Sequence, residues 1–289
     1  MIHTHYSILE SNTTIDKLYD FCLANNWQNC IITDTNSLSG FIDVLSTFKE
    51  VKPIIGVEFR NEYGYFTLLA INQQGLSKLI SLVSDINENG LLNEYTGDDN
   101  LYCISGYQDS DIRRSLHDTQ LTQHLVKNYQ SKFKDRFYLG VDDSETSNQI
   151  RALGQTIPYS PCFSLDQTCD LDVLLKIQER DSTLNRTYPK GFNFKTFSSA
   201  TKEEKSRLCA IVQSCEKITL DPTPLLPKFC DNEISLVRQL CLKGWNKLIE
   251  GKVSPSDRKI YADRMKYELS VIESAKLAGY FLIVQDYIN

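Results

Sequence analysis

Two histidines and three carboxylates near the start of the chain have types and spacing that suit metal-assisted chemistry. His3 and His5 lie in a short apolar opening segment, and side chains two residues apart on a strand share one face. Glu10 follows closely, while Asp34 and Glu58 stand at the ends of two later apolar runs. Such groups on neighbouring strand ends can hold a divalent cation that activates water. Surface histidines and unmetallated carboxylates give the same pattern, so both interpretations stay open.

The sequence gives less support for other catalytic or metal-binding motifs. Asp142 and Asp143 follow another apolar run, where we favour a solvated loop or helix-capping acids over metal ligands. Neither G-x-G-x-x-G nor G-x-x-x-x-G-K-[ST] occurs, which argues against dinucleotide-binding and P-loop folds. The nine cysteines have scattered spacings without C-x-x-C, which disfavours a zinc ribbon or a thioredoxin-type motif and predicts free thiols.

The first 180 residues alternate between strand-like and helix-like patterns. The candidate residues above lie at the ends of the predicted strands. Parallel neighbouring strands need crossover helices, so the alternation favours a parallel sheet or a barrel. The expected strands are 30–33, 54–59, 65–71, 101–105, 137–141 and 159–163. The expected helices are 15–23, 38–48, 75–86, 121–132, 147–153 and 171–178.

The pattern changes after residue 180. Residues 181–199 are polar and predict a long connection, and Thr201-Lys-Glu-Glu204 predicts a capping box that opens a helix. Later segments are an extended proline-rich stretch at 221–227, helices at 233–250 and 256–274, a break at Gly279 and an apolar segment from Tyr280. Because that last segment has no stop signal, we expect the chain to be part of a larger protein.

Composition and charge narrow the class of protein. The net charge is −6 overall, −8 over residues 1–200 and +2 over residues 201–289. An acidic body is a poor clamp for a phosphate backbone, so we expect any nucleic-acid contact in the last third. No apolar run approaches the ~20 residues of a membrane helix. The start lacks the pattern of a secretory signal, which predicts a cytoplasmic protein.

A series of short motifs, in the same order along the chain, resembles the N-terminal PHP (polymerase and histidinol phosphatase) domain of bacterial DNA polymerase III alpha subunits, the C-family replicative polymerases. The early motifs are IHTHYSILE at 2–10, IITD at 31–34 and KPIIGVEF at 52–59, followed by TLLA at 67–70 and DRFYL at 135–139. The later motifs are DVLLKIQ at 172–178, LPKF at 226–229, YELSVI at 267–272 and AGYFLIV at 278–284. The resemblance covers essentially the whole chain.

The resemblance implies a fold, a parent activity and partners. The implied fold is α/β: a distorted (β/α) barrel of the PHP type over residues 1–200, then a mainly helical extension over 201–289 that leads into a palm domain. The implied parent is a DNA-directed DNA polymerase, a nucleotidyltransferase that uses Mg²⁺ in DNA replication and whose catalytic residues lie outside this chain. The implied partners are the rest of the alpha chain, primer-template DNA, and a proofreading exonuclease subunit or other replisome proteins, with no membrane.

Metal-competent members of the family hold a ligand cluster at the strand ends of the barrel. Matched position by position, the resemblance keeps His3, Glu10 and Glu58, and it keeps Asp34 without the histidine that follows it in the family. His5 falls where the family carries an acidic residue. The other ligand positions carry Met1, Thr35, Tyr65, Tyr107 and, near the last strand, Pro161 and Phe163.

These substitutions imply a vestigial site at His3, Glu10, Asp34 and Glu58. Tyrosine, threonine and phenylalanine give a metal cluster neither charge compensation nor soft donors. We therefore expect a structural, metal-poor PHP scaffold with no hydrolase activity of its own and no bound cofactor, in which His3, Glu10 and Glu58 hold metal weakly at most. The alternative is an active phosphoesterase or 3'-5' exonuclease that uses Zn²⁺ or Mn²⁺.

Overall fold

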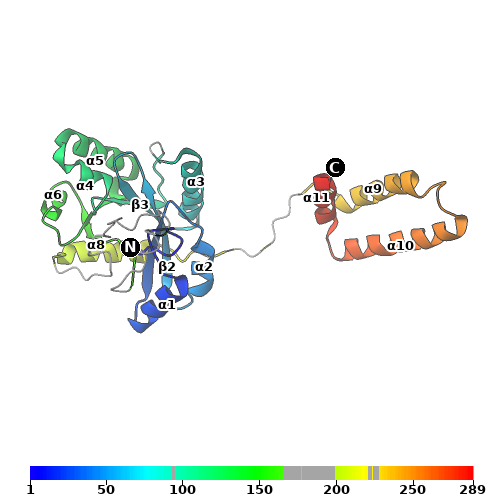
Figure 1. Cartoon of the computed structure of the whole chain (residues 1–289), viewed down its shortest axis with the longest axis horizontal. Helices are drawn as coiled ribbons and strands as arrows, with labels where there is room; N and C mark the ends of the chain where they lie inside the picture. Colours follow the sequence, from blue (N-terminus) through cyan, green and yellow to red (C-terminus); the bar gives the residue numbers. More distant parts are fainter. Residues whose placement is uncertain (93–94, 166–176, 178–198, 221–222, 224–227, 289) are drawn as a thin grey trace. The chain divides into compact units, whose positions relative to one another are not determined.

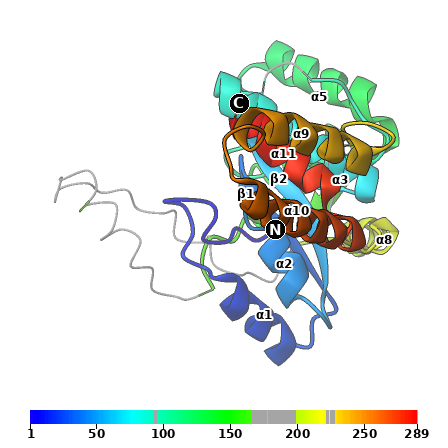
Figure 2. The ribbon, with the colours of Figure 1, turned by 90° about the vertical axis from the view of Figure 1, so that its right-hand side faces the viewer.

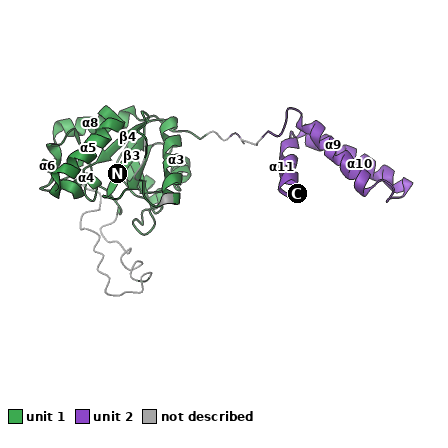
Figure 3. Ribbon diagram, turned by 90° about the horizontal axis from the view of Figure 1, so that it is seen from above, with its two compact units in different colours: residues 1–220 green, residues 221–289 purple. Residues whose placement is uncertain are grey.

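The structure is a computed structural model that describes residues 1–92, 95–165, 177, 199–220, 223 and 228–288. The chain divides into two compact units, Met1–Leu220 and Asp221–Asn289 (Figure 1, Figure 3). The expected connection at 181–199, the expected helix at 171–178 and the expected extended stretch at 221–227 lie almost entirely outside the described residues. So does the DVLLKIQ motif, and the first two residues of LPKF also lie outside them.

Six strands form one sheet in the order of the sequence, which gives the α/β fold expected. They are β1 (Asn29–Thr35), β2 (Lys52–Arg60), β3 (Tyr65–Ala70), β4 (Leu101–Ser105), β5 (Phe137–Val141) and β6 (Thr156–Pro158). The expectation of parallel neighbours was wrong for β3, which is antiparallel to both β2 and β4. Only residues 61–64 join β2 to β3, too few for the crossover that a parallel pair needs.

The first three residues bring the two edges of the sheet together. Ile2 forms a bridge to Ile32 of β1 on one side and to Cys162 on the other. The backbone N–H of His3 donates to the carbonyl of Cys162 at 2.8 Å, and the N–H of Thr33 donates to the carbonyl of Ile2 at 2.9 Å. The sheet is therefore curled into a distorted barrel. The expected strand at 159–163 is corrected, since β6 ends at Pro158 and Cys162 belongs to this isolated bridge.

Helices cover the outer face of the curled sheet. They are α1 (Ile15–Ala24), α2 (Phe41–Thr47), α3 (Gln73–Asn89), α4 (Asp111–Arg114), α5 (Thr119–Phe133) and α6 (Ser147–Arg151), with short 3-10 turns η1 (Ser115–His117) and η2 (Lys134–Arg136). Side chains that satisfy free N–H groups start several of them: Thr14 accepts from Lys17, and Asn72 accepts from Gly75. Helices α1 and α2 are neighbours (Figure 1, Figure 2).

Alternation along each strand divides the core into two clusters. On β2, Ile55, Val57 and Phe59 face outward into the main cluster beneath the helices. Ile54 belongs to a second cluster inside the curl, together with Leu69, Ile104, Tyr107, Ile157 and Tyr159. The interior of the barrel is thus packed with side chains.

Helix α8 (Lys202–Ser214) closes one end of this interior. The capping box predicted at Thr201 and Glu204 is present. Lys52, at the start of β2, donates from Nζ to the carbonyls of Val212 and Cys215 at 2.8 and 2.9 Å, and a cation is favourable at a helix C-terminus. Because α8 packs on β6, the first compact unit extends past the boundary that the sequence placed at residue 200.

The second unit consists of α9 (Glu233–Leu248), α10 (Pro255–Ser274) and α11 (Ala278–Ile288). Gly279 does not end a helix, as the sequence suggested, but lies inside α11. A Cβ there would lie 2.9 Å from the carboxylate of Glu233, so this glycine permits close contact between α9 and α11. Among the described helices, none has both the length and the apolar character required to cross a lipid bilayer.

Ile211 tests whether α8 is an integral part of the barrel. Ile211 is buried in the inner cluster, so Ile211→Ala should lower the free energy of unfolding by about 2–4 kcal/mol. Cys209→Ala, an exposed position on the same helix, should change it by less than about 0.5 kcal/mol. Urea unfolding followed by circular dichroism measures both. Equal effects of the two substitutions would show that α8 only rests on the surface.

Candidate functional site

The inner face of the barrel becomes polar at the end opposite α8. Glu58 of β2 and Thr67 of β3 are register partners, and Tyr107 and Tyr159 follow β4 and β6 closely. His3 enters from the bridging segment, because the side chains of Ile2 and His3 alternate between the two faces. All five side chains are buried. The structure therefore brings two of the predicted site residues, His3 and Glu58, to one place.

His3 sits in a sealed environment. Its ring stacks on Phe163 with centroids 4.1 Å apart, and its Nδ1 lies 3.4 Å from the hydroxyls of both Ser7 and Thr35. Its Nε2 has no hydrogen-bond partner within the described part of the chain and lies 3.8 Å from Oε2 of Glu58. Burial, assisted by the N-terminal ammonium group, lowers the pKa of His3 to about 3.

Glu58 is shifted in the opposite direction. Burial raises its pKa to about 8, against a smaller lowering by a hydrogen bond with Tyr107. Desolvation disfavours the charged form of each residue, so at neutral pH both His3 and Glu58 are uncharged. The 3.8 Å contact between them is a contact of neutral groups, not an ion pair.

Two tyrosines fill the space beside this pair. The rings of Tyr107 and Tyr159 stack with centroids 4.0 Å apart and planes 12° from parallel. Both hydroxyls reach the hydroxyl of Thr67, at 3.1 and 2.8 Å, so the buried phenols are satisfied. Gly140 of β5 permits the stack, since a Cβ there would lie 2.7 Å from Tyr159 and 3.1 Å from Tyr107.

Glu10 and Asp34 belong to the surrounding hydrogen bonds. Thr35 donates to Glu10 in a short hydrogen bond; burial raises the pKa of Glu10 although this bond lowers it. Asp34 accepts from the backbone N–H of Thr4 at 2.6 Å and from the hydroxyls of Thr4 and Ser7 at 2.8 and 2.7 Å. Ser7 and Thr35 thus connect both carboxylates to His3. Asp34 anchors the loop that follows the bridging segment.

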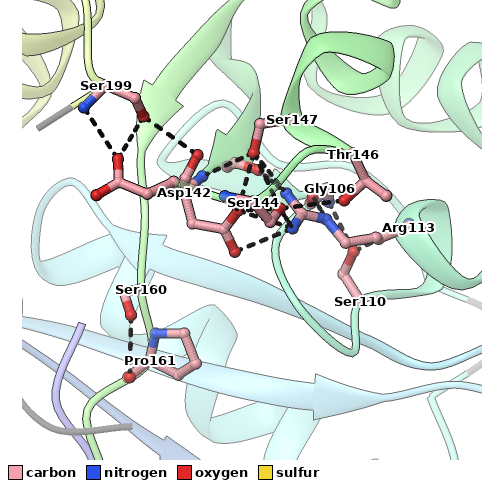
Figure 4. A network of polar contacts seen from close by, with 12 residues as sticks. Gly106, Ser110, Arg113, Asp142, Ser144, Thr146, Ser147, Ser160, Pro161 and Ser199 are labelled. Carbon is pink, nitrogen blue, oxygen red and sulfur yellow. Dashed lines mark hydrogen bonds and ion pairs between the residues drawn. The ribbon is translucent and has the colours of Figure 1, made fainter. Parts of the chain in front are cut away.

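The remaining sequence candidates lie elsewhere. His5 is exposed and contacts Tyr6, so the expected His3–His5 pair on one face is absent. Asp142 lies between α6 and Arg113, which donates to both of its carboxylate oxygens at 3.0 and 2.9 Å (Figure 4). Burial alone would raise the pKa of Asp142, but hydrogen bonds from Ser144 and Arg113 outweigh burial and lower it. Asp143 accepts from Ser199. Both acids hold loops together.

A further buried carboxylate, Asp111, escaped the sequence analysis. It accepts from Ser105 at 2.5 Å, from Asn61 at 2.7 Å and from Tyr129. These bonds join β4, α5 and the turn after β2 around one side chain. The sequence offers one local sign that Asp111 has a structural role: Ser110, directly before it, caps the start of α4.

The residues present do not fit a metal cluster. The described residues include no group of three or more histidines, cysteines or carboxylates that could hold a metal ion. The unpaired Nε2 of His3 and the carboxyl of Glu58 offer two donors, but phenol rings and Phe163 occupy the adjoining space. Such a site lacks the ligand number and charge that a divalent ion needs.

Comparisons with known proteins identify the family of the fold. Residues 1–144 match the family model "PHP domain", and residues 235–289 match "Bacterial DNA polymerase III alpha NTPase domain". The whole chain is 26% identical to DNA polymerase III subunit alpha of Ureaplasma parvum and 25% identical to that of Buchnera aphidicola from Schizaphis graminum. The corresponding Haemophilus influenzae subunit is 24% identical over 99% of the chain. The chain spans 28–29% of the length of these relatives.

Glu58 predicts a specific pH dependence of stability. Folded Glu58 keeps its proton to about pH 8, while the ordinary pKa of 4.5 applies in the unfolded chain. Between these values the folded state binds more protons, so the free energy of unfolding falls as pH rises, by at most ~1.4 kcal/mol per pH unit. His3 acts in the opposite sense, but only between about pH 3 and 6.5.

The N-terminal ammonium group, whose pKa is lowered by burial, acts against Glu58 over part of this range, so the contribution of Glu58 is measured by comparing variants in urea unfolding at pH 6.5, 7.5 and 8.5. The side chain in Glu58→Gln cannot ionise, so this variant should lose the fall in the free energy of unfolding that Glu58 causes as the pH rises. Glu50→Gln, at an exposed position, should show the same pH dependence as the unsubstituted chain. An unchanged slope in Glu58→Gln would contradict the neutral carboxyl.

Proposed function

Residues 1–144 form a PHP domain, and on this premise we propose that the chain is the N-terminal region of a replicative DNA polymerase III alpha subunit in which the PHP barrel is a structural scaffold. In this proposal the parent protein carries out DNA-templated DNA synthesis with Mg²⁺ in the cytoplasm. Its polymerase catalytic residues lie outside residues 1–289. The collinear similarity of the whole chain to alpha subunits supports this assignment.

The filled mouth of the barrel is the observation that carries the scaffold role. Hydrolysis of a phosphoester needs an activated water and a place for the phosphate. Tyr107 and Phe163 stand at positions where the resemblance expects metal ligands. The ring of Tyr107 stacks on Tyr159, and the ring of Phe163 stacks on His3. His3, whose pKa is lowered to about 3 by burial, is also a weak base for activating water. The same side chains stabilise the barrel by burial.

The second unit fits the beginning of a larger domain. The match to the NTPase domain starts within α9 and runs through α11. None of the residues of α10 is buried, and large apolar side chains of α10 and α11 are exposed, among them Ile260, Tyr261, Tyr267, Tyr280 and Tyr287. Exposed apolar surface of this extent is typical of a contact site. We assign it to the polymerase palm of the same chain.

The remaining partners follow from the proposed parent. Primer-template DNA is bound by the whole polymerase, and the barrel offers its surface to a proofreading exonuclease subunit or to another replisome protein. The acidic charge of residues 1–200, net −8, makes the barrel itself a poor partner for DNA and a better one for protein.

A hydrolysis assay distinguishes the scaffold from the active phosphoesterase. The chain should hydrolyse neither bis-p-nitrophenyl phosphate nor labelled single-stranded DNA above blank with added Zn²⁺ or Mn²⁺, because the site cannot assemble a metal cluster. The unsubstituted chain and the Glu58→Ala variant should show the same background rate of hydrolysis. Metal-dependent turnover that disappears in Glu58→Ala would identify a phosphoesterase or exonuclease instead.

A further inference from the structure

A pocket of about 390 Å³ opens beside the vestigial site. Three segments form its walls: the loop that carries Tyr6, Ile8 and Glu10, the segment from Thr35 to Ser39, and the α3 face that bears Val83 and Asn87. None of the lining residues is a lysine or an arginine.

The polar groups of the pocket are suited to a hydrogen-bond donor with positive charge. Glu10 supplies the one charged group among the lining residues. One of its oxygens accepts from Thr35, and within the described part of the chain the other oxygen has no hydrogen bond. The remaining polar lining consists of hydroxyls and side-chain amides, including Ser37 and Asn87. A guanidinium group presents five N–H donors in a fixed plane and matches such a set of oxygens.

The walls are held in place without a ligand. The Tyr6 hydroxyl donates to Asp43 at 2.5 Å, and Gly40 lets the ring pack closely, since a Cβ there would lie 2.5 Å from it. Asn36 has φ of 50°, in the left-handed region that asparagine tolerates. Its side-chain oxygen accepts from the N–H of Arg60 at 3.1 Å. Such preorganisation lowers the entropy cost of binding.

The charge and the exposed apolar side chain near the pocket favour a basic segment of a protein as its ligand. Residues 1–200 carry a net charge of −8, so this part of the chain as a whole attracts a cationic segment. Asp34, a second carboxylate, acts on Glu10 more strongly than Arg60, the nearby cation, and Arg60 does not line the pocket. At the rim, Ile8 is 79% exposed, which offers an apolar contact next to the charged one.

We propose that this pocket receives an arginine side chain from a segment of a partner protein, with Glu10 as the charge that binds it and Ile8 as an adjoining apolar contact. The proposal rests on the scaffold role inferred above, because it gives the barrel a surface for holding a partner.

NMR titration of the isotope-labelled chain with Nα-acetylarginine methylamide tests the proposal, and the matched citrulline compound is the uncharged control. EDTA is present throughout, so that metal bound at Glu10 does not contribute. Arginine should cause saturable shifts of the amides of residues 35–39 and 87, and citrulline should bind at least tenfold more weakly. Glu10→Gln should raise the Kd for arginine at least tenfold, while Glu50→Gln should leave it unchanged.

Equal binding of arginine and citrulline, absence of saturable shifts, or an unaltered Kd in Glu10→Gln would overturn the proposal. The scaffold role is tested separately by the hydrolysis assay. A chain that fails the titration but lacks hydrolysis would still be a scaffold, with its contact elsewhere. A chain that hydrolyses phosphoesters and also binds arginine would retain the pocket and lose the scaffold role.

Discussion

The bridge formed by Ile2 between Ile32 and Cys162 is the constraint on which the rest of the barrel depends. This single residue closes the curled sheet, and it places His3 inside. Closure removes water from the mouth of the barrel, and in that environment charged groups are costly. The shifts of His3 and Glu58 toward their neutral forms are the direct consequence.

A closed, uncharged interior needs side chains that fill volume and satisfy each other's polar atoms. The Tyr107–Tyr159 stack with Thr67 does both, and Gly140 leaves the room that the two rings need. At the other end of the barrel, Ile211 and Cys215 of the α8 region fill the interior. Protein groups thus pack both ends of the barrel, as the proposed scaffold role requires.

Much of this could be predicted from the sequence, because strand and helix periodicity and the capping box at Thr201 are local signals. The resemblance placed His3 and Glu58 in one site, but it did not predict that both are buried. The antiparallel β3, the bridge at Cys162 and the packing of α8 on β6 depend on contacts between distant segments, which no local pattern encodes. Asp111 was missed for the same reason, since its partners Asn61 and Tyr129 come from separate elements.

The number of metal ions bound per chain tests most directly whether side chains have replaced a metal cluster in the barrel. The chain is expressed in medium supplemented with Zn²⁺ and Mn²⁺, purified without chelator, and examined by elemental analysis after gel filtration. If side chains have taken the place of a metal cluster, the protein will hold well below one metal ion per chain. Two or more ions per chain, retained through gel filtration and lost in Glu58→Ala, would contradict the account.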